Sequence, residues 1–263
     1  MRRSKVLEKI RQGIPVICTN TSWTNSWRAP EMVGRLGIDC VWIDMEHRDF
    51  TYADMAVMTL GARAADMDAL VRVRKDSYAD FFRPLEEGAA GLMVPHVRSL
   101  EEADWVIRNS KFAPVGMRGY DGVGADCFHY VAYRDDYTEF VNRETFLMVQ
   151  VEDRETVEFC EDLAAKPGID GLFVGPADLS QSYGKLLDFG CAEVQSAIDR
   201  VAAAAKKHGK FWGMPAGDMD AARKLIERGA LFIAIGADMF YLYLAFKQLK
   251  DDWDKLMKDI GKA

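Results

Sequence analysis

Several polar side chains that could bind a ligand or catalyse a reaction stand at the C-terminal ends of short apolar segments. They are Asp44, Glu46, His47, Arg72, Arg74, His96, Gln150, Glu152, Asp178 and Asp238. Glu152 and Asp178 are separated by the length of one strand-and-helix unit. Nearby carboxylates repel each other unless one is protonated or a cation lies between them, and oxygen ligands suit Mg²⁺ or Mn²⁺. The pair is a candidate metal site, although each residue could instead cap the helix that follows it.

His47 and Arg72 extend this chemistry to proton transfer and anion binding. A histidine beside carboxylates can act as a general base near neutral pH, but His47 could also be a surface residue bonded to Asp49. Arg72 lies inside the apolar segment LVRVR, where a guanidinium needs a protein carboxylate or an anionic substrate as partner. Arg74 is expected to be exposed. His96 could line the same site or be a hydrogen-bonded histidine near its rim.

The segments that position these residues are short and almost continuously apolar, which is typical of strands buried on both faces of a parallel sheet. They are PVICT (15–19), CVWIDM (40–45), ALVRV (69–73), GLMVPH (91–96), FLMVQVE (146–152), GLFVGP (171–176), FWGMPA (211–216) and LFIAIGAD (231–238). Amphipathic stretches separate most of them, and several end in a helix-terminating glycine, at Gly37, Gly88, Gly209 and Gly229.

Eight strand-and-helix units in 263 residues favour a single-domain (β/α)₈ barrel, a TIM barrel, over residues 1–263. The alternative, a doubly wound open sheet, often carries a G-x-G-x-x-G motif after its first strand, and none follows PVICT. Active sites of TIM barrels lie at the C-terminal ends of the strands. The polar residues above are therefore expected to meet at one mouth of the barrel.

Two segments depart from this regular pattern. Residues 97–145 are too long for one helix and contain the irregular stretch FAPVGMRGYDGVGADCFHYVAYRDDY (112–137), which we expect as a loop insertion at the C-terminal face of the barrel. Residues 239–263 predict a long C-terminal helix with an aromatic beginning. We expect that helix to dock on the bottom of the barrel or to make oligomer contacts with a partner subunit.

Composition limits the classes of partner. The formal net charge is −7 and there is no basic cluster, which argues against nucleic acid. The five cysteines show no C-x-x-C spacing, which favours a reducing compartment over a disulfide framework. The N-terminal segment predicts an amphipathic helix rather than a signal peptide, and no apolar run is long enough to cross a membrane. These features predict a cytoplasmic protein with no membrane partner.

The assembled motifs resemble those of the HpcH/HpaI family of class II pyruvate aldolases, which includes 2-keto-3-deoxy sugar acid and 4-hydroxy-2-oxo-heptanedioate aldolases. The matching segments, in family order, are IDMEH (43–47), LVRV (70–73), EGAAGLMVPHV (87–97), GMRGY (116–120), VQVED (149–153) and GIDGLFVGPADLSQSYG (168–184). The combination of VQVE with GLFVGPADLS is the most specific of these signals.

The resemblance implies a metal-dependent aldolase, an aldehyde-lyase that reversibly cleaves a 4-hydroxy-2-oxo acid to an aldehyde and pyruvate through a metal-bound pyruvate enolate. It implies Glu152 and Asp178 as ligands of Mg²⁺ or Mn²⁺, with Co²⁺ and Zn²⁺ as alternatives. His47 would be the acid/base, and Arg72 would bind and stabilise the keto acid. The remaining substrate-binding residues implied by the resemblance are Gln150, Gly175, Pro176, Ala177 and Asp178. The partners would be keto-acid and aldehyde substrates and further copies of the chain in a homohexamer, a trimer of dimers.

Three differences from the family pattern accompany the resemblance. Glu86 stands where the family has the aspartate that partners the catalytic histidine, and its longer carboxylate is expected to act there as a catalytic residue. The arginine that usually follows the G-x-R-G segment is missing, and the loop at residues 19–31 is unusually aromatic. The last two predict an altered aldehyde pocket. Two other functions stay open: a citryl- or malyl-CoA lyase-like enzyme, and a catalytically silent barrel that serves as a binding subunit.

Overall fold

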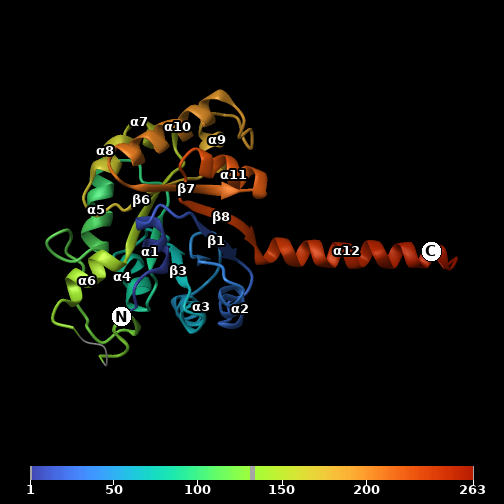
Figure 1. The fold of residues 1–263 in the computed structure, drawn as a ribbon, viewed down its shortest axis with the longest axis horizontal. Coiled ribbons are helices and arrows are strands. Elements are labelled where there is room, and N and C mark those ends of the chain that lie inside the picture. The colour runs from blue at the N-terminus through green and yellow to red at the C-terminus, as the bar shows by residue number, and fades with distance from the viewer. Residues whose placement is uncertain (1, 131–133, 263) are drawn as a thin grey trace.

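The computed structural model describes residues 2–130 and 134–262 and forms a closed barrel of eight parallel strands (Figure 1). Each strand pairs with the next along the chain, and β1 closes the barrel against β8. The strands are β1 (Val16–Thr21), β2 (Cys40–Asp44), β3 (Asp68–Arg72), β4 (Gly91–Val94), β5 (Phe146–Val151), β6 (Gly171–Val174), β7 (Phe211–Ala216) and β8 (Phe232–Ala237). All eight apolar segments of the sequence form strands, and the predicted TIM barrel is confirmed.

Helices connect the strands and cover the outside of the barrel, and two further helices precede β1 and follow β8. They are α1 (Lys5–Arg11), α2 (Arg28–Arg35), α3 (Tyr52–Ala64), α4 (Ala79–Glu86), α5 (Leu100–Ser110), α6 (Tyr137–Glu144), α7 (Arg154–Glu158), α8 (Cys160–Ala165), α9 (Pro176–Ser182), α10 (Ala192–Lys207), α11 (Met219–Glu227) and α12 (Asp238–Asp259), with a 3₁₀ turn η1 (Ala125–Cys127). The four predicted terminating glycines have φ between 63° and 90°, a conformation that glycine adopts without strain.

Two apolar layers hold this arrangement together. The larger lies between the strands and the outer helices, and the smaller fills the lumen. In the lumen, Phe146, Phe211 and Phe232 pack against one another, and Trp42 meets Phe173 edge to face with 5.8 Å between the ring centroids. The barrel is therefore a packed core and not a pore. Beyond these aromatic rings, polar side chains gather near the C-terminal ends of the strands.

The loop insertion lies at the opposite face from the one predicted. β4 is followed by α5, and the irregular stretch begins only after α5 has returned to the N-terminal ends of the strands. There the Lys111 ammonium donates to the Thr145 carbonyl and to the Asp170 carboxylate, just before β5 and β6. The expectation of a C-terminal-face insertion was wrong because its starting point is set by the length of α5. Residues 131–133 of this stretch lie outside the described part of the chain.

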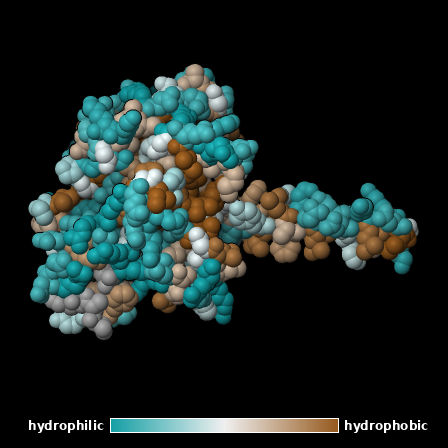
Figure 2. All heavy atoms as spheres, in the orientation of Figure 1, coloured by the Kyte–Doolittle hydropathy of each residue, from teal (hydrophilic) through white to brown (hydrophobic). Residues whose placement is uncertain are grey.

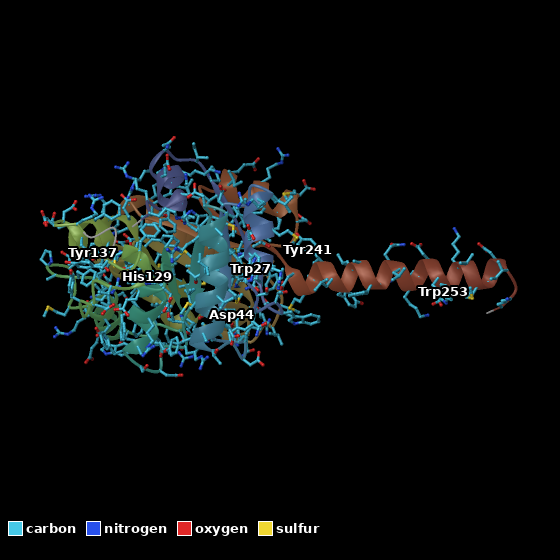
Figure 3. All side chains as sticks on the ribbon, turned by 90° about the horizontal axis from the view of Figure 1, so that it is seen from below. Trp27, Asp44, His129, Tyr137, Tyr241 and Trp253 are labelled. Carbon is cyan, nitrogen blue, oxygen red and sulfur yellow. The ribbon has the colours of Figure 1, made fainter. Side chains whose placement is uncertain are left out.

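The C-terminal helix α12 projects away from the barrel (Figure 1). None of its described side chains is buried, and hydrophobic side chains gather mainly along one side of it (Figure 2). Tyr241 lies where the helix leaves the barrel, and Trp253 lies far out along it (Figure 3). Docking on the bottom of its own barrel is thus excluded, and contact with another subunit stays a prediction. Within the described ranges, no helix is both long and apolar enough to cross a membrane.

Candidate active site

A cavity of about 700 Å³ opens at the C-terminal ends of the strands. It brings together eight of the residues that the sequence predicts for the site: His47, Arg72, Gln150, Glu152, Gly175, Pro176, Ala177 and Asp178. Trp42 and Phe173 line its inner end, so the apolar filling of the lumen is also the floor of the cavity. The concentration of polar groups above an aromatic floor matches the usual construction of a small-molecule site.

Glu152 is the most deeply buried carboxylate of the cavity, with 1% of its surface exposed. It accepts a hydrogen bond from Gln150 Nε2 at 2.9 Å and another from the His96 backbone N–H at 2.8 Å. Burial raises the pKa of Glu152 to about 7, and the nearby charges of Glu46 and Asp178 act in the same direction. A buried, crowded carboxylate of this kind gains most from a neighbouring cation.

Asp178 enters the cavity from the first turn of α9, directly after a close backbone approach. A Cβ atom at Gly175 would lie 2.5 Å from Glu152 Oε2, so only glycine leaves room for that carboxylate. Pro176 then starts α9 at a position that suits proline, because its missing N–H is not needed there. Gly175 is the N-cap of α9 and Asp153 that of α7, so neither Asp178 nor Glu152 is the capping residue that the alternative interpretation required.

His96, Glu152 and Asp178 each place one potential ligand atom within 4.8 Å of the others. Gln150 Oε1 is buried in the same cavity and has no hydrogen-bond partner among the described residues. Buried oxygens without donors, beside a pair of carboxylates, fit a divalent cation. His96 was not among the metal ligands expected from the sequence. The position of VPHV at the end of a strand predicted only that the His96 ring could line the site.

Arg72 forms the internal ion pair that was one of its two predicted roles. Its Nε donates to Asp44 Oδ1 at 3.0 Å and its Nη2 to Asp44 Oδ2 at 2.6 Å, while the guanidinium lies 4.8 Å from the centroid of a Trp42 ring. Burial raises the pKa of Asp44, but Arg72 and the backbone N–H groups of Glu46 and His47 outweigh it and hold that pKa below its usual value. Arg72 also lines the cavity, and Arg74 is exposed as predicted.

His47 lines the mouth of the cavity with 55% of its side chain exposed. Its Nε2 lies 3.8 Å from Glu46 Oε2, which gives the ring an acidic neighbour without burying it. The ring is thus open to a molecule bound in the cavity.

The structure does not bring Glu86 to His47 within one chain. Glu86 is the last residue of α4, which starts near the C-terminal end of β3 and runs back to the N-terminal face of the barrel. Burial raises the pKa of Glu86 there, and its charged neighbours include Arg83, Arg118, Asp121 and Asp126. The predicted pairing is therefore absent from this chain because the two residues lie at opposite ends of the barrel.

A closed parallel barrel with carboxylates, an arginine and a histidine converging at its strand ends defines a (β/α)₈-barrel enzyme with its site at the C-terminal face. The profile of the HpcH/HpaI aldolase/citrate lyase family matches residues 25–245, and the chain belongs to this family. The resemblance seen in the sequence is confirmed.

Three similar proteins illustrate the match. A 5-keto-4-deoxy-D-glucarate aldolase of Klebsiella pneumoniae is 32% identical over 226 residues, which cover 86% of this chain and 87% of the relative. A hydroxypyruvate/pyruvate aldolase of Paraburkholderia phytofirmans is 35% identical over 224 residues, 84% of this chain and 86% of the relative. The crystal structure of a family member from Burkholderia cenocepacia superimposes with a TM-score of 0.87 at 33% identity and covers 95% of this chain and 99% of its own.

Proposed function

We propose that this aldolase-family enzyme reversibly cleaves a 4-hydroxy-2-oxo acid into pyruvate and an aldehyde and needs a divalent cation. The observation that carries the proposal is the convergence of Glu152 and Asp178 with Arg72 and His47 in one cavity at the strand ends. Relatives named as keto-sugar-acid and pyruvate aldolases support the same reaction class. Mg²⁺ or Mn²⁺ is the proposed cation, because the carboxylate oxygens of Glu152 and Asp178 suit these ions.

Different residues of the cavity bind the substrate, stabilise its charge and transfer its proton in this reaction. Cleavage between C3 and C4 leaves negative charge on the 2-oxo group, and the Arg72 guanidinium stabilises that charge from the wall of the cavity. The backbone at Ala177 and Asp178 binds the carboxylate, and Gln150 orients the bound keto acid from the adjacent strand. His47 removes the proton of the 4-hydroxyl group in cleavage and returns it in synthesis.

Glu152 and Asp178 would hold the cation, which when bound supplies a Lewis acid for the oxygens of the keto acid. A Schiff-base mechanism needs a lysine beside the substrate carbonyl. Among the described residues that line the cavity, the one lysine is Lys224, which is exposed on α11 rather than placed at a strand end. This distribution of side chains supports the metal-dependent reaction over the lysine-dependent one.

We extend the proposal to a homohexamer, a trimer of dimers, in which α12 contacts a neighbouring subunit. The exposed aromatic and aliphatic side chains of that helix support an oligomer, because a monomer would leave them in water. A cytoplasmic location and the lack of nucleic-acid or membrane partners follow from composition and stay predictions.

Exchange of the methyl protons of pyruvate for deuterium tests the proposed half-reaction without any choice of aldehyde. We expect exchange in D₂O with added Mn²⁺ or Mg²⁺, its loss with EDTA, and its absence in Glu152→Ala. Glu155→Ala is the matched control, because Glu155 lies exposed on α7. The loss of the methyl proton signal of pyruvate is measured by NMR after the metal has been removed. If exchange continues in the presence of EDTA and in Glu152→Ala, the proposal of a metal-dependent reaction is wrong.

A panel of aldehydes with pyruvate then identifies the second substrate. Aldol addition is followed by loss of pyruvate and by mass spectrometry of the product. We expect at least one hydroxylated or carboxylated aldehyde to react, because the cavity is far larger than pyruvate. If the protein neither exchanges the protons of pyruvate nor adds pyruvate to any aldehyde, it is the catalytically silent barrel of the alternative hypothesis.

A further inference from the structure

His96 stands beside the proposed metal ligands in an unusual backbone conformation. It follows β4 by two residues and has a φ of 49°, in the left-handed region that few residues other than glycine adopt. This turn directs its backbone N–H to Glu152 Oε1 at 2.8 Å. The main chain at the end of β4 is thereby tied to the deepest carboxylate of the cavity, and the imidazole ring lies against the same group.

The ring is oriented by a second carboxylate outside the cavity. His96 Nδ1 lies 3.1 Å from Asp153 Oδ2, and Arg98 Nη2 donates to the other Asp153 oxygen at 3.2 Å. The same Nδ1 lies 3.5 Å from Glu152 Oε1, so the nitrogen that Asp153 orients is also the one that faces the deepest carboxylate of the cavity. Carboxylates beside a metal-binding histidine fix the orientation of its ring, which is the part that Asp153 plays here.

The distances around the ring suit a shared ion. One nitrogen of His96, one oxygen of Glu152 and one oxygen of Asp178 all lie within 4.8 Å of one another. His96 Nε2 is also 3.9 Å from Glu46 Oε1. Ligand atoms that are each about 2.1 Å from one ion lie roughly 3 to 4 Å apart, so a small side-chain movement completes the group. Gln150 is 2% exposed, and its Oε1 has no hydrogen-bond partner among the described residues, so this region lacks a positive partner.

We infer that His96 supplies a nitrogen ligand to the metal centre, together with Glu152 and Asp178, and shifts the preference of the site from Mg²⁺ toward transition-metal ions. Imidazole nitrogen binds Mn²⁺, Co²⁺ and Zn²⁺ well, whereas Mg²⁺ favours oxygen ligands and retains several waters. The inference rests on the metal part of the proposed function and adds the ligand that decides which metal the chain selects.

Pulsed electron paramagnetic resonance of bound Mn²⁺ tests for the nitrogen directly. The wild-type chain with one equivalent of Mn²⁺ should show coupling to ¹⁴N, and protein grown with ¹⁵N-labelled histidine should show ¹⁵N coupling instead. His47→Asn should keep the coupling, and His96→Met should lose it. The labelled wild-type sample needs no substitution, so the result does not depend on how well a variant folds.

Metal affinity provides the second readout. His96→Met should weaken Mn²⁺ binding by at least the ~10-fold that loss of even an indirect metal partner costs and should change Mg²⁺ binding by less than ~3-fold, since Mg²⁺ takes water in place of nitrogen. If Mn²⁺ binds without nitrogen coupling, or if the coupling disappears in His47→Asn, His96 is not the nitrogen ligand. The proposed metal site itself would still stand in either case. Mn²⁺ that binds Glu152→Ala as tightly as the wild type would instead refute the proposed metal centre itself.

Discussion

Arg72 and Asp44 are joined by two parallel hydrogen bonds at the ends of adjacent strands, from Nε to Oδ1 at 3.0 Å and from Nη2 to Oδ2 at 2.6 Å. Arg72 and Asp44 are direct register partners in the pairing of β2 with β3. The same carboxylate accepts the backbone N–H groups of Glu46 and His47. Asp44 therefore holds both the Arg72 guanidinium in the wall of the cavity and the turn that carries His47.

Arg72→Lys should impair pyruvate binding although it preserves the charge. A lysine cannot form two parallel bonds to Asp44, so its ammonium would not be held against the keto acid. We expect kcat/KM for metal-dependent pyruvate exchange to fall by about 100-fold, the usual effect of misplacing a positioned group. Arg74→Lys is the control, because among the described residues Arg74 donates hydrogen bonds to the backbone carbonyls of Met45 and Phe50 rather than to Asp44. Equal activity of the two variants would contradict the role assigned to Arg72.

The fold was predictable because its strands are buried on both faces. Segments such as FLMVQVE and GLFVGP are apolar at almost every position, and their polar residues stand only at the exit. In a parallel barrel all such exits meet at one mouth. Strand ends separated by more than a hundred residues, such as Asp44 and Asp178, could therefore be assigned to one site before any distance was known.

The remaining features depend on where a helix ends and how a turn is directed. Glu86 lies at the far face because α4 carries it there, and the insertion lies at that face because α5 precedes it. His96 joins Glu152 only through the left-handed turn after β4, which nothing in VPHV specifies. Hydrophobic periodicity reports burial, not these local geometries.

Asp238 should control the order of the loop that follows β1. Its carboxylate accepts the backbone N–H groups of Ser22, Trp23 and Thr24 and the Thr24 hydroxyl, at 2.7 to 3.2 Å. Asp238→Ala leaves these donors without their partner, so we expect faster amide hydrogen exchange at Trp23 and Thr24 and a loss of about 1–3 kcal/mol in unfolding free energy.

Asp218→Ala is the matched control for that change. Asp218 caps α11 and accepts the Ala221 N–H at 2.7 Å, so its loss costs about 1 kcal/mol. Amide exchange in the β1 loop should not respond to it. Exchange at Trp23 and Thr24 that is the same in both variants would show that Asp238 does not order the loop.

The apolar side of α12 should drive assembly. Six exposed residues recur at alternating intervals of four and three positions and so share one face: Leu242, Phe246, Leu249, Trp253, Leu256 and Ile260. The double substitution Phe246→Asp and Trp253→Asp should reduce the molar mass measured by light scattering, because charged groups cannot be buried unpaired in an interface. Gln248→Asp with Lys255→Asp introduces the same side chains on the opposite face and should leave the mass unchanged. A wild-type chain that is monomeric at micromolar concentration would refute the oligomer outright.

Asp68 should be the main anchor of the N-terminal helix that closes the bottom of the barrel. Its fully buried carboxylate pairs with Arg2 and accepts hydrogen bonds from Ser4 Oγ at 2.6 Å and from the Val6 N–H at 2.9 Å. These bonds hold Val6 against the residues that fill the lumen. Asp68→Ala removes the shared acceptor and releases α1 from the barrel, so we expect a loss of about 2–4 kcal/mol in urea unfolding.

Asp66→Ala separates this effect from the loss of a surface charge. Asp66 also contacts Arg2, at 2.9 Å, and lies near Lys5, but 61% of its side chain is exposed. Water and salt screen such pairs, so the cost should stay below about 1 kcal/mol. Losses of similar size in the two variants would mean that the surface charge, not the buried hydrogen bonds, holds α1. A large loss confined to Asp68→Ala would instead show that α1 is held by a buried carboxylate, because only that group leaves its partners unsatisfied inside the protein.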